Sequence, residues 1–205
     1  EYRLAPEHKF PVPLEDCYAA AKALYTNQLI LNTDPEKITI IGDSAGGNLT
    51  AAVCLMARDK GEFTPRRQIL IYPALGNCYT EESPYRSVQE NGCDYLLTSV
   101  KMEDYLNLYQ SSAEDRQNPY FAPRLEKDLR NLPVTLILTA EYDPLGDEGE
   151  VYGRKLHAAG NHVEVHRIYG AFHGFFALGI KFLHVQESFK YINQFLNKSY
   201  EKILQ

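Results

Sequence analysis

Residues 37–47 read Lys-Ile-Thr-Ile-Ile-Gly-Asp-Ser-Ala-Gly-Gly. The β-branched residues before the first glycine predict a buried strand, and the Ala-rich run after it predicts a helix over about 45–60. Between them, Gly42, Ser44 and Gly46 form a G-x-S-x-G pattern, which is typical of a sharp strand-to-helix turn that exposes a serine hydroxyl. We expect glycine on both sides because a side chain there would clash across the turn. The pattern predicts that Ser44 is a nucleophile.

A phosphate-binding loop at a helix N-terminus is the alternative interpretation of the same stretch. However, GDSAGG has no P-loop lysine and does not match G-x-G-x-x-G, so the sequence favours the nucleophile. The backbone N–H groups of Ala45 and Gly46 would then lie at the helix start and donate to a developing oxyanion.

The rest of the chain alternates between strand and helix patterns, which predicts an α/β fold with a mainly parallel sheet covered by helices on both faces. A single domain over 1–205 fits this length. The predicted strands are 37–41, 68–72, 134–140 and 163–169, and the predicted helices are 14–27, 45–60, 147–159 and 184–204.

Residues 75–118 break the alternation, because they are polar and rich in tyrosine and contain one helical pattern near 99–109. We expect this segment to be an insertion over the active site. Tyr85, Tyr95 and Tyr105 are its candidate substrate contacts, although packing against the core explains such rings equally well.

A serine nucleophile needs a general base, and the base needs a carboxylate that fixes its tautomer. Asp143 directly follows the predicted strand 134–140, which places it on the same rim of the sheet as Ser44. The rivals are Glu141 and Asp147, and Asp147 has a second interpretation as the N-cap of the next helix. Strand-end placement favours Asp143 as the acid.

Among the six histidines, only His173 follows the last predicted strand in a glycine-containing loop, so we predict that it is the base. A metal site built from His157, His162 and His166 is the competing interpretation. Their spacing does not match H-E-x-x-H, and we expect neither a metal nor a cofactor.

The formal net charge of −6 and a pI near 5.5 argue against a nucleic-acid partner, which would require clustered Lys and Arg. No apolar run approaches the ~18 residues of a membrane span. The four cysteines form no CxxC pair, which favours a reducing, cytoplasmic location; a disulfide between Cys78 and Cys93 remains an alternative. The sequence is compatible with a homodimer but gives no support for one.

Nine segments, in order along the chain, resemble the hormone-sensitive-lipase-like esterases of the α/β-hydrolase superfamily. They are YRLAPE (2–7), FP (10–11), GDSAGGN (42–48), YPA (72–74), NPYFAP (118–123), LP (132–133), AEYDPL (140–145), DEG (147–149) and FHGF (172–175). The resemblance implies the α/β-hydrolase fold and assigns the family's nucleophile, acid and base to Ser44, Asp143 and His173.

The resemblance also implies hydrolysis of carboxylic esters with short acyl chains, from acetyl to about hexanoyl, through an acyl-enzyme. An amidase or formamidase using the same triad is one alternative. A catalytically silent binding protein is another, since the family includes a plant hormone receptor.

The chain departs from the family pattern in two places. Gly146 stands where the family usually has Arg, and the family's HGGG segment, which supplies further oxyanion donors, is absent. We therefore expect a chain that lacks its N-terminal strands, by roughly 80 to 110 residues on family analogy. Residues 38–41 should then form an exposed edge of the sheet.

Overall fold

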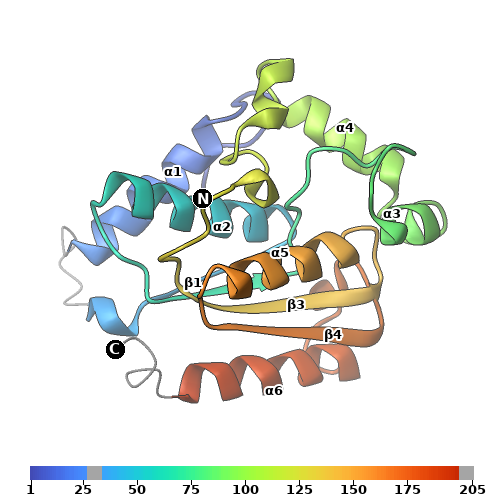
Figure 1. Cartoon of the computed structure of the whole chain (residues 1–205). Helices are drawn as coiled ribbons and strands as arrows, with labels where there is room; N and C mark the ends of the chain where they lie inside the picture. Colours follow the sequence, from blue (N-terminus) through green and yellow to red (C-terminus); the bar gives the residue numbers. More distant parts are fainter. Residues whose placement is uncertain (27–33, 199–205) are drawn as a thin grey trace.

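A computed structural model describes residues 1–26 and 34–198. Its sheet contains β1 (Thr39–Asp43), β2 (Arg67–Ile71), β3 (Val134–Tyr142) and β4 (Val163–Phe172), in the order β1-β2-β3-β4 with every pair parallel (Figure 1). The predicted α/β fold with a parallel sheet is confirmed. Parallel pairing brings the carboxyl ends of the strands to one rim, where Asp43, Ile71 and Leu138 lie in register.

Helices cover both faces of this sheet (Figure 1). Helices α2 (Ala45–Lys60) and α5 (Gly146–Ala158) pack on one face, and α6 (Leu183–Asn197) packs on the other. The strands present apolar side chains to both faces of the sheet. In β3, Ile137 packs in the cluster with α2 and α5, whereas Leu136 and Leu138 pack in the cluster with α6. Continuous apolar runs are therefore required at these strands.

Helix α1 (Val12–Tyr25) lies against α2. A second group of helices lies on the side of the molecule where β3 has its carboxyl end (Figure 1). That group includes α3 (Arg86–Asn91) and α4 (Ser99–Tyr109), of which only α4 was predicted. Short 3₁₀ turns occupy Pro35–Lys37, Ala113–Gln117, Pro123–Leu125 and Phe175–Leu178.

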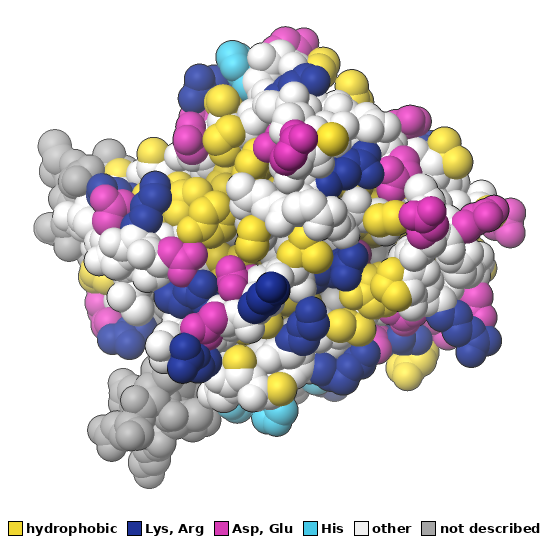
Figure 2. Space-filling model, turned by 45° about the horizontal axis from the view of Figure 1, so that its top comes forward, with side chains coloured by type: hydrophobic (Ala, Val, Ile, Leu, Met, Phe, Trp, Pro, Cys, Tyr) yellow, Lys and Arg dark blue, Asp and Glu magenta, His cyan; other side chains and the backbone are white. Residues whose placement is uncertain are grey.

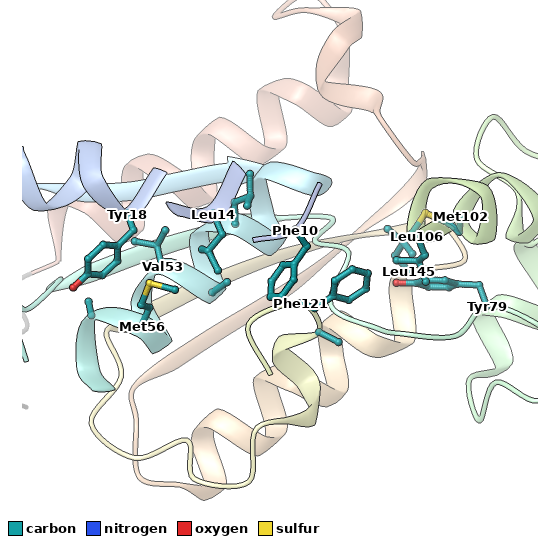
Figure 3. Packing of buried hydrophobic residues seen from close by; sticks show 14 of the residues in the cluster. Phe10, Leu14, Tyr18, Val53, Met56, Tyr79, Met102, Leu106, Phe121 and Leu145 are labelled. Atoms are coloured by element: carbon teal, nitrogen blue, oxygen red, sulfur yellow. The ribbon is translucent and has the colours of Figure 1, made fainter. Parts of the chain in front are cut away.

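A large apolar cluster joins the N-terminal residues, α2 and α4 (Figure 3). At its centre, the Phe10 ring lies edge-on to Tyr109 and Phe121, at centroid distances of 5.7 and 5.5 Å. Val53 and Met56 of α2 lie towards one end of the cluster and Met102 and Leu106 of α4 towards the other. The chain before α1 therefore anchors the far end of the 75–118 segment.

Several element boundaries differ from the predictions. Strand β1 begins at Thr39 because Pro35–Lys37 form a 3₁₀ turn, in which the Asp34 side chain accepts the Glu36 N–H. Helix α1 begins at Val12 and ends at Tyr25. Residues 27 and 199–204, which the helix predictions included, lie outside the described residues.

The predicted N-cap at Asp147 is wrong, because α5 begins at Gly146 after Leu145. The Asp147 carboxylate instead accepts the backbone N–H of Ser87, in the first turn of α3, at 2.8 Å. A contact with a residue sixty positions away has replaced the local cap.

The outer strand β1 pairs only with β2 among the described residues. Ile41 on this strand is 52% exposed, as the expected sheet edge requires. Elsewhere, acidic and basic side chains are intermixed with apolar ones on the face drawn in Figure 2. Within residues 1–26 and 34–198, no helix has the length and apolar character needed to cross a membrane.

A buried carboxylate holds the start of the 75–118 segment. Glu148 of α5 is 1% exposed, and its Oε1 accepts the Leu75 N–H and the Tyr79 hydroxyl, each at 2.8 Å. Burial raises the pKa of the Glu148 carboxyl from 4.5 to about 7, against the opposing effects of these two hydrogen bonds and Arg124. The ionised form is therefore disfavoured in the folded state.

We predict that Glu148→Gln makes the protein more resistant to urea than the parent chain above pH 7. The folded pKa lies above the unfolded value, so the carboxyl's contribution to stability is complete below pH 4.5 and falls as pH rises to about 7. In the parent, the free energy of unfolding should fall by about 3 kcal/mol as the Glu148 carboxyl ionises, whereas the variant has no such group to ionise. Urea unfolding at pH 5 and 8 measures it, with exposed Glu82→Gln as control. An equal pH response in all three proteins would contradict the prediction.

Candidate active site

Ser44 lies at the turn between β1 and α2 in a conformation that is rare for a residue with a side chain, at φ 53° and ψ −116°. Its N–H donates to the Ile71 carbonyl at 2.9 Å, which extends the β1–β2 ladder beyond β1, and its carbonyl accepts the Asn48 N–H at 3.1 Å. The same residue thus ends the strand and starts the helix.

The prediction of a steric requirement for glycine is confirmed at Gly42. A Cβ there would lie 2.2 Å from the Gly46 carbonyl oxygen. At Gly46 the prediction is wrong, since a Cβ would meet no heavy atom within 4 Å in the part of the chain that the structure describes. Gly47 supplies the second close approach instead, with its Cβ position 2.8 Å from Pro73 Cβ.

Ala45 and Gly46 are the first two residues of α2. Their backbone N–H groups have no carbonyl within the helix to accept them, because the first four N–H groups of any helix lack an i−4 partner. These donors lie beside Ser44 at the positive end of the helix dipole.

His173 directly follows β4 and is 8% exposed. Its Nε2 lies 2.8 Å from Ser44 Oγ, and its Nδ1 lies 2.8 Å from Asp143 Oδ2. With the ring proton on Nδ1, the imidazole donates to the carboxylate and accepts from the serine hydroxyl. The structure therefore brings together three predicted residues from three separate loops.

Asp143 directly follows β3 and is completely buried. Its Oδ1 accepts the Leu145 N–H at 2.9 Å, and its Oδ2 faces His173. The rival Glu141 instead accepts the Gly170 N–H at 2.7 Å, and Asp147 is bonded to Ser87. Neither rival is hydrogen-bonded to the imidazole.

The competing metal interpretation finds no support in the described residues, where no group of three or more His, Cys, Asp and Glu side chains could hold a metal ion. The His166 ring stacks on Tyr191 at 3.9 Å, and burial lowers its pKa. His162 and His166 both lie near Glu164, at 3.7 and 3.8 Å.

The three candidate substrate contacts lie in different surroundings. The Arg124 guanidinium lies over the Tyr85 ring, 5.3 Å from its centroid. The Tyr95 ring lies 5.1 Å from that of Tyr142, the residue before Asp143, and the Tyr105 side chain is 56% exposed. Of the three, Tyr95 is the one in ring contact with the strand that carries Asp143.

Two features of the site escaped the sequence analysis. An open, largely apolar hollow of about 420 Å³ lies beside the nucleophile turn, lined by β1, Ile71, Phe176 and Ala177. In addition, the Tyr72 ring packs 4.8 Å from the His173 ring. No sequence pattern indicates either feature, because both arise from the meeting of the β1, β2 and β4 loops.

We predict opposite effects for alanine at the two glycines that flank Ser44. Gly42→Ala should destabilise by ~2 kcal/mol or more, because its Cβ meets the backbone of Gly46, which cannot move without distorting α2. Gly46→Ala should be neutral or stabilising by up to ~1 kcal/mol, since alanine favours helix and the space is open. Urea unfolding of both variants measures this, and similar losses in both would contradict it.

Comparison with known proteins identifies the family to which this fold belongs. A family model described as the alpha/beta hydrolase fold matches residues 1–177. An arylesterase of Saccharolobus solfataricus is 38% identical over 177 residues, which are 85% of this chain and 56% of that protein. An ethyl acetate hydrolase of Pseudomonas putida is 36% identical, over 87% of this chain and 55% of its own length.

Among solved structures, a hyperthermophilic esterase from the archaeon Pyrobaculum calidifontis matches with a TM-score of 0.84 at 42% identity. The match covers 96% of this chain and 63% of the esterase. The chain thus spans little more than half the length of the two curated relatives.

Proposed function

We propose that this chain, which belongs to the hormone-sensitive-lipase-like esterases of the α/β-hydrolase superfamily, hydrolyses carboxylic esters through Ser44, His173 and Asp143. The observation that carries the proposal is the continuous hydrogen-bonded path from the serine oxygen through the imidazole to a buried carboxylate, with both distances at 2.8 Å.

In the proposed mechanism, Ser44 Oγ attacks the ester carbonyl while His173 Nε2 takes its proton. The carbonyl oxygen becomes an oxyanion, to which the Ala45 and Gly46 N–H groups donate. Collapse of the tetrahedral intermediate expels the alcohol, which receives the proton from Nε2 and leaves an acyl-serine. In the second half-reaction, His173 Nε2 takes a proton from water, which attacks the acyl carbonyl. The carboxylic acid leaves, and Ser44 Oγ recovers its proton from Nε2.

The burial of Asp143 supports its assigned role. A completely buried carboxylate needs hydrogen-bond donors, and here the Leu145 N–H and the imidazole provide them. When His173 gains the serine proton, the new positive charge lies against this carboxylate in a site of low dielectric constant. Asp143 thus favours the protonation state that forms during attack.

We predict that Ser44→Ala lowers kcat for p-nitrophenyl acetate by ~10⁶ and Asp143→Asn by ~10⁴, measured in the natural gene product. The asparagine variant should lose activity because its amide donates to Nδ1 and favours the wrong tautomer. Glu141→Gln is the matched control, since its carboxylate contacts Gly170 and not His173. Ser44→Ala with parental activity, or Glu141→Gln as damaged as Asp143→Asn, would refute the assignment.

We also propose a preference for short acyl chains, up to about hexanoyl, with 75–118 as an insertion over the site. The name of the Pseudomonas putida relative, an ethyl acetate hydrolase, supports the first point. The Tyr95–Tyr142 ring contact and the hydrogen bond from Asn91 to the Glu141 carbonyl support the second, since both join this segment to the end of β3.

For acyl-chain length, we expect kcat/KM to be highest for p-nitrophenyl esters of two to six carbons and to fall with longer chains, an expectation that rests on family analogy. Tyr95→Ala should change this profile more than Tyr105→Ala, because Tyr95 contacts the strand of the acid and Tyr105 is largely exposed. Initial rates over the ester series measure both effects. A maximum at sixteen carbons would contradict the preference.

The same triad could attack amides, so matched ester and amide substrates distinguish an esterase from an amidase or formamidase. The named relatives are an arylesterase and an ethyl acetate hydrolase, which favours the ester. The complete Ser44–His173–Asp143 path argues against a silent binding protein.

We further propose a cytoplasmic location, because all four cysteines are free, including the exposed Cys93. Fractionation of the source cells, with the gene product followed by immunoblot, tests this.

A further inference from the structure

We infer that Tyr72 is a positioning residue, which fixes the Ser44 turn relative to the His173 loop. The sequence analysis assigned no role to it. The inference rests on the proposed function and adds to it a residue that acts through Asp43 and His173.

The Tyr72 side chain bridges the two loops that carry the nucleophile and the base. Its hydroxyl donates to Asp43 Oδ2 at 3.1 Å, and Asp43 immediately precedes Ser44. The Tyr72 ring lies edge-on to the ring of Phe176, three residues after His173, with the ring centroids 6.4 Å apart. The Tyr72 ring also packs against the His173 ring at 4.8 Å, so one side chain contacts both loops.

The backbone around Tyr72 adds hydrogen bonds to β3 and to Ser44. The Tyr72 N–H donates to Leu138 of β3, the strand that leads to Asp143, at 2.6 Å. On either side, the Ile71 carbonyl accepts the Ser44 N–H at 2.9 Å, and the Ala74 N–H donates to the Ser44 carbonyl at 3.3 Å. The turn after β2 is therefore hydrogen-bonded to Ser44 and to the strand that leads to Asp143, and its Tyr72 ring contacts His173.

Tyr72 has an unfavourable backbone conformation, which its surroundings must stabilise. Tyr72 has φ 34°, in the left-handed region that bulky residues avoid, and it precedes Pro73, which restricts it further. Such residues persist where neighbouring contacts over-determine them, and they cluster at active sites. Tyr72 is 1% exposed.

The hydroxyl and the ring make separable contributions. Burial, with Asp43 nearby, raises the pKa of Tyr72, so its hydroxyl remains a neutral donor to the Asp43 carboxylate throughout the working pH range. Replacing tyrosine with phenylalanine removes this donor but keeps the ring beside His173. The Ser44 turn would lose its link to the His173 loop while the core stays filled.

A purely structural tyrosine would behave differently. Tyr152 is the matched control, since it is completely buried in the sheet and helix core away from the triad, and its hydroxyl has no hydrogen-bond partner among the described groups. Tyr152→Phe also removes a buried tyrosine hydroxyl, but from a cluster that contains none of the three triad residues. Any loss common to both variants reports folding, and a loss confined to Tyr72→Phe reports positioning.

The test compares Tyr72→Phe, Tyr152→Phe, Ser44→Ala and the parent in the natural gene product, at a temperature well below every Tm. We expect Tyr72→Phe to lower kcat for p-nitrophenyl acetate by ~10–100-fold with KM within about twofold, because misplacement of reacting groups costs rate rather than binding. Phosphorylation of Ser44 by diethyl p-nitrophenyl phosphate should slow similarly. Tyr152→Phe should match the parent in both assays.

The outcomes separate this inference from the proposed function. Ser44-dependent turnover with Tyr72→Phe equal to the parent, or with both phenylalanine variants equally impaired, overturns the positioning role alone. Absence of Ser44-dependent turnover in the parent overturns the proposed function and the positioning role with it. A selective kcat loss in Tyr72→Phe supports both.

Discussion

The reversal of the chain at Ser44 is the constraint on which the site depends. Strand β1 and helix α2 approach so closely that Gly42 can carry no side chain, and Ser44 itself adopts a left-handed φ. The turn holds because its N–H and carbonyl are both bonded to neighbouring elements, to Ile71 and Asn48. Parallel pairing then brings the ends of β3 and β4, with Asp143 and His173, to the same rim.

Burial increases along the hydrogen-bonded path, from the half-buried Ser44 through His173 to the fully buried Asp143. This gradient suits the proposed chemistry. The serine must meet a substrate from solvent, whereas the carboxylate acts through its charge, which water would screen. Asp143 is the most deeply buried of the three because β3, the strand before it, lies between two neighbours in the sheet.

The sequence predicted the features that are local. The bounds of α2, the parallel sheet and the strand-end positions of the three reacting side chains follow from periodicity and turn chemistry within a few residues of each site. The catalytic roles of those side chains stay predictions until the variants are assayed.

Features that depend on distant contacts escaped prediction. Asp147 looked like a helix cap but bonds to Ser87, and Gly47 rather than Gly46 meets Pro73. The short helix α3 has only two buried residues and no apolar stripe to reveal it. Tyr72 was noted only within the YPA segment and received no role, because its contacts with Asp43 and His173 appear only when the loops are placed.

The attachments of the 75–118 segment indicate where it can vary. Near its start, the Ser87 hydroxyl donates to the Pro144 carbonyl at 2.8 Å and accepts the Asp147 N–H at 3.2 Å, which couples α3 to the loop of the acid. At its far end, Phe10 N–H donates to the Tyr109 carbonyl at 2.8 Å, and Ser111 bonds back to Phe10.

The middle of the segment combines exposed apolar side chains, with Leu96 64% and Val100 71% exposed, and buried ones such as Leu97 and Met102. A substitution at the exposed positions would leave both attachments intact, whereas a substitution at Ser87 would remove hydrogen bonds to the loop that follows Asp143. If this segment contacts the substrate as proposed, substitutions at its exposed positions would change substrate preference and leave the contacts of Ser87 with the loop of Asp143 in place.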